Sequence, residues 1–219
     1  MKNSWKAYRT FASRGYCIFC YLVIPACLIL WHGTKGTLFG VQDINVVSNS
    51  LVLLLAAADY MTLNGVNSSK YGFGILRCTS KGQEHLERAL YMDFFIRFVV
   101  IAVIDFICGI ISYQKYGADF NKDMMMMHVI VLFVTFACIN ITVFISRFFT
   151  TMVNFMFVTY LVVSLLVVGT SVGLIYGFSF GHYNPVLWLL GGIVLSVISV
   201  YATKRYVLYN YRRSFLEGK

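Results

Sequence analysis

Long apolar stretches alternate with short polar segments along most of this chain. Six stretches stand out, at Gly15–Trp31, Ile44–Met61, Asp93–Tyr113, Met125–Ser146, Met152–Gly177 and Pro185–Thr203. A helix needs about 20 apolar residues to cross a bilayer core, and only helices and closed barrels bond all of their backbone polar groups inside lipid. A barrel would show alternating segments of about 10 residues, whereas Val158–Gly169 is apolar on every side. The pattern therefore predicts an all-α, polytopic membrane protein with six transmembrane helices.

The composition leaves little material for a soluble domain. Hydrophobic residues make up 59% of the 219 residues and charged residues 12%, against about 25% charged residues in an ordinary soluble domain. The longest segment between the apolar stretches, Thr62–Met92, is too short to build a core of its own. We therefore expect one transmembrane domain over residues 1–219, with a retained first helix in place of a cleaved signal peptide.

The net charge of +9 is distributed very unevenly between the two sides of this predicted bundle. Three basic residues on one side, Lys35, Lys115 and Lys122, are offset by Asp43, Asp119 and Asp123. The other side carries fourteen basic residues: Lys2, Lys6, Arg9, Arg14, Lys70, Arg77, Lys81, Arg88, Arg147, Lys204, Arg205, Arg212, Arg213 and Lys219. The positive-inside rule places this second side, and with it both termini, in the cytoplasm. We expect a bacterial plasma membrane, with the charge serving topology and attraction to anionic lipids rather than nucleic-acid binding.

The first fourteen residues have an amphipathic pattern. Lys2, Lys6 and Arg9 fall on one helical face, and Trp5, Tyr8 and Ala12 fall on another. Residues 1–14 therefore predict a short helix at the cytoplasmic membrane interface, with a disordered basic tail as the alternative.

A polar segment after the second apolar stretch predicts a cytoplasmic helix over residues 78–91. Ser80 and Gln83 fit a capping box at its start, and Glu84 and Arg88 form an i,i+4 ion pair in the favoured orientation. Leu86 and Leu90 supply an apolar stripe that continues towards Phe94 and Phe95. This helix runs into the third apolar stretch and is either a surface for a soluble partner or a solvated connector.

The same segment carries a family resemblance. A small-residue turn, a basic residue and a short helix are found at Arg77, Thr79, Ser80, Lys81, Gly82, Glu84, Leu86 and Ala89–Leu90. With the six spans and the N-terminal segment, this order resembles the permease subunits of type-2 ATP-binding-cassette exporters. The family often has a proline where this chain has Cys78–Thr79–Ser80, and a re-entrant hairpin where Tyr176–Pro185 is only a short turn.

The resemblance implies that the helix after the second span is a coupling helix. It would dock on a separate ATP-binding subunit, which would hold ATP and magnesium, while this chain would bind no cofactor. It also implies a homodimer or a paired permease. The predicted coupling residues are Arg77, Ser80, Lys81, Gly82, Glu84, Leu86 and Arg88.

Four ionisable residues lie within or at the ends of predicted spans, where charge is costly without a partner: Asp59, Asp93, Arg97 and Asp105. Arg97 follows Asp93 by four residues and lies at a depth similar to Asp59 on the neighbouring span. We therefore expect Arg97 to pair with Asp93, Asp59 or both, as a packing clamp in preference to a substrate site.

Asp105 lies about 18 Å along the same helix from Asp93. No basic residue is expected at its depth, so it should be protonated, face water, or bond to a neighbour such as Asn140, Thr142 or Ser164. It is the strongest single candidate for a proton or cation site, and a neutral structural Asp is the alternative. His128, near the outer end of the fourth predicted span, is expected to be an interfacial residue and not a ligand.

Enzymatic chemistry is not predicted. The chain has no G-x-x-x-x-G-K-[ST] sequence for nucleotide binding, no H-E-x-x-H zinc sequence and no G-x-S-G serine. Its six cysteines lie in spans or in the cytoplasmic loop, which argues against disulfides, and its four histidines are scattered. We expect an exporter permease. The alternatives are an ATPase-independent carrier or substrate-binding membrane subunit coupled through Asp105, and a membrane scaffold or immunity protein that transports nothing.

Overall fold

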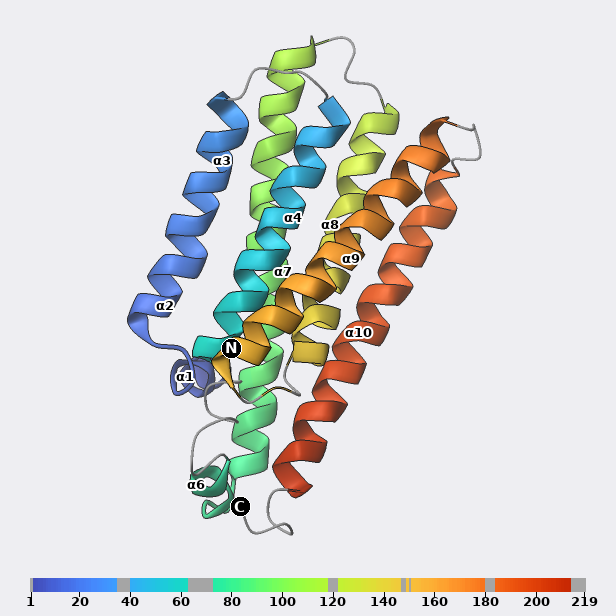
Figure 1. Cartoon of the computed structure of the whole chain (residues 1–219). Coiled ribbons are helices and arrows are strands. Elements are labelled where there is room, and N and C mark those ends of the chain that lie inside the picture. Colours follow the sequence, from blue (N-terminus) through green and yellow to red (C-terminus); the bar gives the residue numbers. More distant parts are fainter. Residues whose placement is uncertain are drawn as a thin grey trace.

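The computed structural model describes residues 2–34, 40–62, 73–117, 122–146, 149, 151–179 and 184–213, and every regular element in these ranges is a helix. The elements form an elongated bundle (Figure 1). In chain order they are α1 (Lys2–Arg9), α2 (Arg14–Ile18), the π-helical turn η1 (Phe19–Val23), α3 (Ile24–Thr34), α4 (Gly40–Ala58), the 3-10 turn η2 (Asp59–Met61), α6 (Gly74–Arg77), α7 (Gly82–Tyr116), α8 (Lys122–Ser146), α9 (Met152–Ser179) and α10 (Pro185–Arg213).

Four segments of the described chain are long and apolar enough to cross a membrane. They are Arg14–Thr34, Gly82–Gln114, Met125–Ser146 and Pro185–Arg212. Two shorter apolar helical segments, Val47–Met61 and Met152–Leu166, lie beside them. The chain is therefore compatible with a multi-pass membrane protein, as the apolar pattern predicts.

Helix α8 occupies the centre of the bundle. Its apolar segment is 61% buried within the protein, against 17–28% for the other three long segments. It packs against α4, α7, α9 and α10. Helices α4, α7, α9 and α10 therefore each turn one face towards α8 and leave another face exposed on the outside of the bundle.

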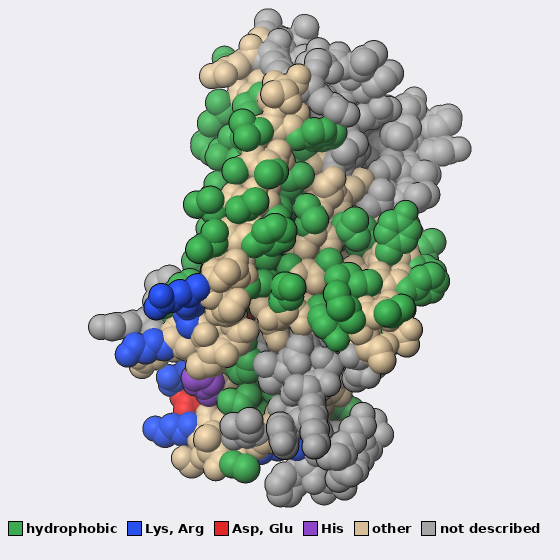
Figure 2. Space-filling view, turned by 60° about the vertical axis from the view of Figure 1, so that its left-hand side comes forward, with side chains coloured by type: hydrophobic (Ala, Val, Ile, Leu, Met, Phe, Trp, Pro, Cys, Tyr) green, Lys and Arg blue, Asp and Glu red, His purple; other side chains and the backbone are tan. Residues whose placement is uncertain are grey.

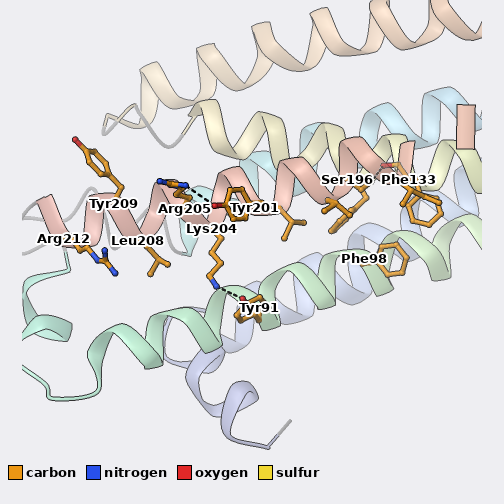
Figure 3. Close-up of a pocket in the computed structure, with 14 residues that line it drawn as sticks. Tyr91, Phe98, Phe133, Ser196, Tyr201, Lys204, Arg205, Leu208, Tyr209 and Arg212 are labelled. Carbon is orange, nitrogen blue, oxygen red and sulfur yellow. Dashed lines mark hydrogen bonds between the residues drawn. The ribbon is translucent and has the colours of Figure 1, made fainter. Parts of the chain in front are cut away.

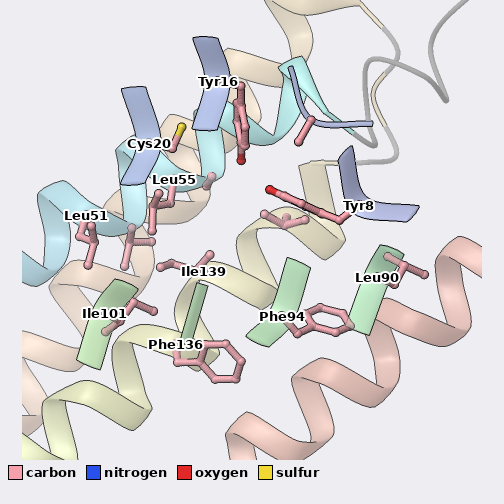
Figure 4. Packing of buried hydrophobic residues seen from close by; sticks show 14 of the residues in the cluster. Tyr8, Tyr16, Cys20, Leu51, Leu55, Leu90, Phe94, Ile101, Phe136 and Ile139 are labelled. Atoms are coloured by element: carbon pink, nitrogen blue, oxygen red, sulfur yellow. The ribbon is translucent and has the colours of Figure 1, made fainter. Parts of the chain in front are cut away.

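The buried cluster of Figure 4 joins helices that are distant in the sequence. Leu51 and Leu55 of α4 face Ile101 of α7 and Ile139 of α8, and all four side chains are buried. Towards the α1 end of the bundle, Tyr8, Tyr16, Leu90 and Phe94 continue the cluster. Close packing of such side chains supplies much of the attraction between helices in lipid, where no hydrophobic effect drives helices together.

The first long helix is interrupted by a proline. Pro25 has no backbone N–H to donate to the carbonyl of Tyr21, and its ring crowds that carbonyl. The chain responds with the π-helical turn η1 directly before Ile24, which is one of the usual ways in which a helix accommodates such a defect. Arg14 to Thr34 remains a continuous helical rod.

The N-terminal helix is shorter than predicted. Helix α1 ends at Arg9, and Ser13 caps the next helix by accepting a hydrogen bond from the backbone N–H of Tyr16. Residues 2–13 therefore form a helix followed by a turn, and Arg14 begins the next helix.

The apolar face of α1 packs on α7. Ala7, Tyr8 and Ala12 are almost completely buried, while Trp5 remains 41% exposed. The Tyr8 hydroxyl bonds to the hydroxyl of Tyr21, and burial raises the pKa of Tyr8 far above its usual range. Helix α1 is thus attached to the bundle along its length.

Charge and apolar surface separate along the long axis. Hydrophobic side chains cover the upper part of the face in Figure 2, and the basic side chains gather near its lower end. The lower end in Figure 1 is formed by α1, α6, the start of α7 and the end of α10. Among the described residues, the basic side chains of α1, α6, the start of α7 and the end of α10 therefore lie towards one end of the bundle.

Candidate functional site

Residues 73–81, the described part of the polar segment that leads into α7, fold into a compact elbow. Residues Gly74–Arg77 form α6, and the chain then turns through Cys78–Lys81 into α7. Thr79 stabilises this turn, since its hydroxyl donates to the carbonyl of Leu76 at 2.7 Å and its own carbonyl accepts from the N–H of Gly82 at 3.1 Å. Gly82 is buried against Leu76 and leaves no room for a side chain.

The predicted start of this helix is wrong in two respects. Residues 78–81 are a turn, so the helix predicted over 78–91 begins at Gly82 and continues without a break to Tyr116. The N-cap position is Lys81, and its side chain makes no capping hydrogen bond. Gln83 donates to Glu87 at 3.0 Å instead of closing a capping box with Ser80. The tight contact at Gly82 sets the start of the helix in place of a side-chain cap.

The predicted coupling residues divide into two groups. Ser80, Lys81, Glu84 and Arg88 are exposed on the elbow and the first turns of α7, and we call these four residues the elbow surface. The predicted ion pair between Glu84 and Arg88 is present. Because the elbow surface carries two basic residues and one acidic residue beside a hydroxyl, it is suited to polar contact with a soluble protein.

The remaining three coupling residues face inward. Leu86 is fully buried among the core residues, and Gly82 is buried as described. Arg77 lies over the ring of Tyr211 on α10, 5.5 Å from its centroid, in a cation–π arrangement. These residues join the elbow to α10 and to the core, so they hold the elbow surface in place and are poorly placed to contact a partner.

Helix α1 supports the elbow from the other side. The Thr10 hydroxyl and His85 Nε2 are 3.1 Å apart, and the rings of Phe11 and His85 lie 6.2 Å apart. The adjoining residues Ala89 and Leu90 of α7 are fully buried. A force on the elbow surface would therefore move α1 and α7 together.

Directly above the elbow, a buried guanidinium joins α7 to α4. Arg97 Nη2 lies 2.6 Å from Asp59 Oδ1 and 2.8 Å from Asp93 Oδ2. All three side chains are at most 2% exposed. The pairing predicted for Arg97 is confirmed with both carboxylates, and we call these three residues the charge clamp.

The charge clamp sits where α4 ends. The turn η2 begins at Asp59, and Thr62 closes it by donating its backbone N–H at 3.1 Å and its hydroxyl at 3.0 Å to the carbonyl of Asp59. The ring of Tyr60 lies 5.1 Å from that of Phe155 on α9. Removing one partner from a buried ion pair leaves an uncompensated charge and costs about 3–5 kcal/mol. The clamp therefore fixes the end of α4 against the middle part of α7.

Asp105 has a partner that the sequence analysis did not identify. Its Oδ1 lies 3.2 Å from Nδ1 of His128 on α8, and the two side chains are 14% and 8% exposed. The expectation of no basic residue at this depth is therefore wrong, because the imidazole of His128 is buried in the bundle beside Asp105.

The suggested neighbours of Asp105 make other bonds. The Thr142 hydroxyl donates to the carbonyl of Cys138 and the Ser164 hydroxyl to that of Tyr160, each four residues back on its own helix. Asn140 lies twelve residues from His128 on α8, about 18 Å along the axis.

A second buried histidine, from another helix, contacts the same stripe of α7. Ser112 follows Asp105 by seven residues and therefore shares its face. The Ser112 hydroxyl is 3.3 Å from Nε2 of His32 on α3. Gly109 lies between them, where an added Cβ would be 3.7 Å from the His128 ring. No sequence pattern links these histidines, because they reach α7 from two different helices.

A small cavity adjoins Asp105. It has a volume of about 10 Å³ and is lined by Asp105, Ser48, Thr135, Cys108 and six apolar residues. This volume is close to the minimum that a single water molecule needs. Within the described ranges no three His, Cys, Asp or Glu side chains gather closely enough to hold a metal ion.

Comparison with protein-family models, with curated proteins and with solved structures finds no match to this chain.

Proposed function

We propose that this chain is the permease subunit of an ATP-driven exporter, moved by a separate ATP-binding subunit. The observation that carries the proposal is the continuity of α7. This helix has 35 residues, which is about 52 Å of unbroken helix. It begins at the exposed elbow surface and passes through an apolar segment long enough to span a bilayer. One rigid element thus connects a polar surface, where a soluble partner could push, with the membrane interior.

Six spans are part of this proposal. Helices α4 and α9 have 19 and 28 residues, which correspond to about 28 Å and 42 Å. Both lengths approach or exceed the hydrocarbon thickness of about 30 Å, and both helices pack against the central α8. An even number of spans puts α1, the elbow and the end of α10 on one side, where the basic residues favour the cytoplasm.

The charge clamp suits such a mechanism. It fixes the end of α4 to α7 about 22 Å along α7 from the elbow, so movement of the elbow is passed to a second helix. The proposed partners are an ATP-binding subunit, which carries ATP and magnesium, and a second permease chain. The proposed location is a bacterial plasma membrane.

Copurification with the elbow surface altered tests this proposal. The full chain is tagged, expressed with its neighbouring genes and purified in mild detergent. We expect an ATP-binding subunit to copurify with the native chain and with the control Lys6→Glu, which changes an exposed basic residue on α1. The double variant Lys81→Glu/Arg88→Glu should lose this subunit while keeping the native amount of folded chain. Absence of an ATP-hydrolysing protein from all three preparations contradicts the proposal.

A second function is favoured by the pair of Asp105 and His128. A carboxylate and an imidazole 3.2 Å apart, deep in a membrane helix and beside a water-sized cavity, are suited to binding and releasing a proton. The chain would then be a carrier driven by a proton gradient without an ATPase. This function requires that Asp105→Asn abolish proton-dependent substrate uptake in vesicles free of ATP, whereas an exporter of the first type would show no such uptake.

A further inference from the structure

A long groove runs along α10 where this helix lies against α7 and α8 (Figure 3). It has a volume of about 900 Å³ and follows α10 from Ile193 to Arg212, a distance of about 28 Å. Tyr91 and Phe98 of α7 and Phe133 and Phe136 of α8 form the opposite side. Its size is at the upper end of the range for ligand-binding cavities.

Contacts at two positions along the groove fix α10 relative to its neighbours. At the apolar end, the Ser196 hydroxyl donates to the carbonyl of Phe133 at 2.9 Å. Helix α10 comes close to α8 there because Gly192 has no side chain. At the other end, the Lys204 ammonium group donates a hydrogen bond to the hydroxyl of Tyr91 on α7. Specific polar contacts are present at both ends, so the groove is part of the fold.

The groove is apolar at one end and cationic at the other. Ile193 to Tyr201 extend along phenylalanine rings for about 12 Å, close to the thickness of about 15 Å of hydrocarbon in one leaflet. Lys204 to Arg212 cover the next 12 Å or so. Tyr91, Tyr201 and Tyr209 lie within or beside this cationic part, and tyrosine is enriched at the level of lipid headgroups.

The cationic end has positive charge available for an anion. Its three cations are Lys204, Arg205 and Arg212, and none of the fourteen lining residues is acidic. Glu87, outside the lining, lies 3.8 Å from Lys204 and partly neutralises it. Arg205 donates to the neutral hydroxyl of Tyr201 at 3.0 Å. Within the described part of the chain, no carboxylate lies at ion-pair distance from Arg205 or Arg212.

We propose that this groove is a binding site for one anionic phospholipid. Its phosphate would lie at Arg205 and Arg212, with Lys204 nearby, and an acyl chain would lie against Phe98, Phe133 and Phe136. Charge complementarity selects an anionic occupant, because basic pockets between membrane helices are suited to anionic headgroups. The adjoining apolar part selects a lipid over a free phosphate, since a soluble anion would leave it empty. The proposal is independent of whether an ATPase acts on the chain.

Lipid retention provides the test. The full chain is reconstituted into nanodiscs with equal amounts of phosphatidylglycerol and phosphatidylcholine, and the lipids that remain bound after release are counted by native mass spectrometry. We expect one phosphatidylglycerol to be retained in clear preference to phosphatidylcholine. In Arg205→Gln/Arg212→Gln this preference should fall on the order of tenfold or more, because each surface cation attracts an anionic lipid appreciably.

Two further variants separate the effect of charge at this site from the effect of surface charge elsewhere and of the apolar part of the groove. Lys6→Gln/Arg14→Gln removes two exposed basic residues from α1 and α2 and should keep the preference. Val197→Trp fills the apolar part without changing charge and should reduce retention of both lipids. Equal retention of phosphatidylglycerol in the two charge variants overturns the proposal. So does disulfide cross-linking of two copies through Val197→Cys without bound lipid, which would make the groove an interface between copies of the chain.

Discussion

Gly82 and Leu76 are in backbone contact: a Cβ atom at position 82 would lie 1.8 Å from the Leu76 carbonyl oxygen and 2.9 Å from Thr79 Oγ1. The elbow can therefore form only if residue 82 has no side chain. This contact replaces the side-chain cap that helix α7 lacks.

Gly82→Ala is expected to destabilise the elbow. Alanine normally favours a helix over glycine by about 1 kcal/mol, but here the added methyl group must displace backbone, at a typical overpacking cost of about 1–3 kcal/mol. The midpoint of thermal unfolding in detergent should fall, and proteolysis near residue 80 should become faster. Gly74→Ala is the matched control, because an added Cβ there meets nothing within 4 Å. Equal behaviour of the two variants would contradict the contact.

The charge clamp should show strong coupling in a double-mutant cycle. Arg97→Ala should lower the free energy of unfolding by about 3–5 kcal/mol, because it leaves the buried carboxylates of Asp59 and Asp93 without their cation. Asp59→Ala should cost less, because Arg97 still pairs with Asp93. The double variant should lose less than the sum, by about 0.5–3 kcal/mol. Glu84→Ala and Arg88→Ala provide the comparison, since this exposed helical pair should couple by only about 0.3–0.5 kcal/mol. Additive losses at Arg97 and Asp59 would show that the pair does not form.

His128 and Asp105 should also be coupled. Replacing His128 with Ala removes a hydrogen-bond partner from a largely buried carboxyl group, which costs about 1–3 kcal/mol. His128→Ala introduced into the Asp105→Ala variant should lower the stability clearly less, because the carboxyl partner of His128 is already absent. Thermal unfolding of the three variants measures this difference. His32→Ala, which alters the other buried histidine, should be additive with Asp105→Ala, and coupling of similar size there would argue against a specific pair.

Cys78 is a natural probe for the side on which the elbow lies. It is exposed in the turn before α7. A membrane-impermeant maleimide should label it in inverted vesicles and leave it unlabelled in intact cells, because the basic loop is expected in the cytoplasm. Cys78→Ser identifies the signal. Labelling of Cys78 from outside intact cells would reverse the topology and remove the elbow from the reach of a cytoplasmic ATPase.

The charge clamp could be predicted from the sequence, since Asp93 and Arg97 are one helical turn apart and Asp59 ends the preceding apolar stretch. The pair of Asp105 and His128 could not. A depth taken from the ends of the apolar stretches is valid only if the helices end at the same level. Asp105 lies about 16 Å from the end of α7 and His128 only about 9 Å from the start of α8, because α7 extends past α8 (Figure 1).

Other features depend on packing that a linear pattern does not contain. The central position of α8 and the groove along α10 follow from which faces meet, and the apolar stretches are similar in composition. The start of α7 does not follow from Ser80, although Ser80 is a suitable capping residue, because the close contact at Gly82 determines where the helix begins. Glycine at that position carries information about a neighbouring backbone, which sequence spacing alone does not identify.

The uninterrupted helix α7 also determines how far a displacement would travel. Arg97 lies about 22 Å from Gly82 and about 28 Å from Tyr116. If α7 pivots at the charge clamp, a displacement of its Gly82 end produces a displacement of its Tyr116 end in the opposite direction that is roughly 1.3 times larger. Opening outside would then accompany closing inside without any hinge in the rod itself.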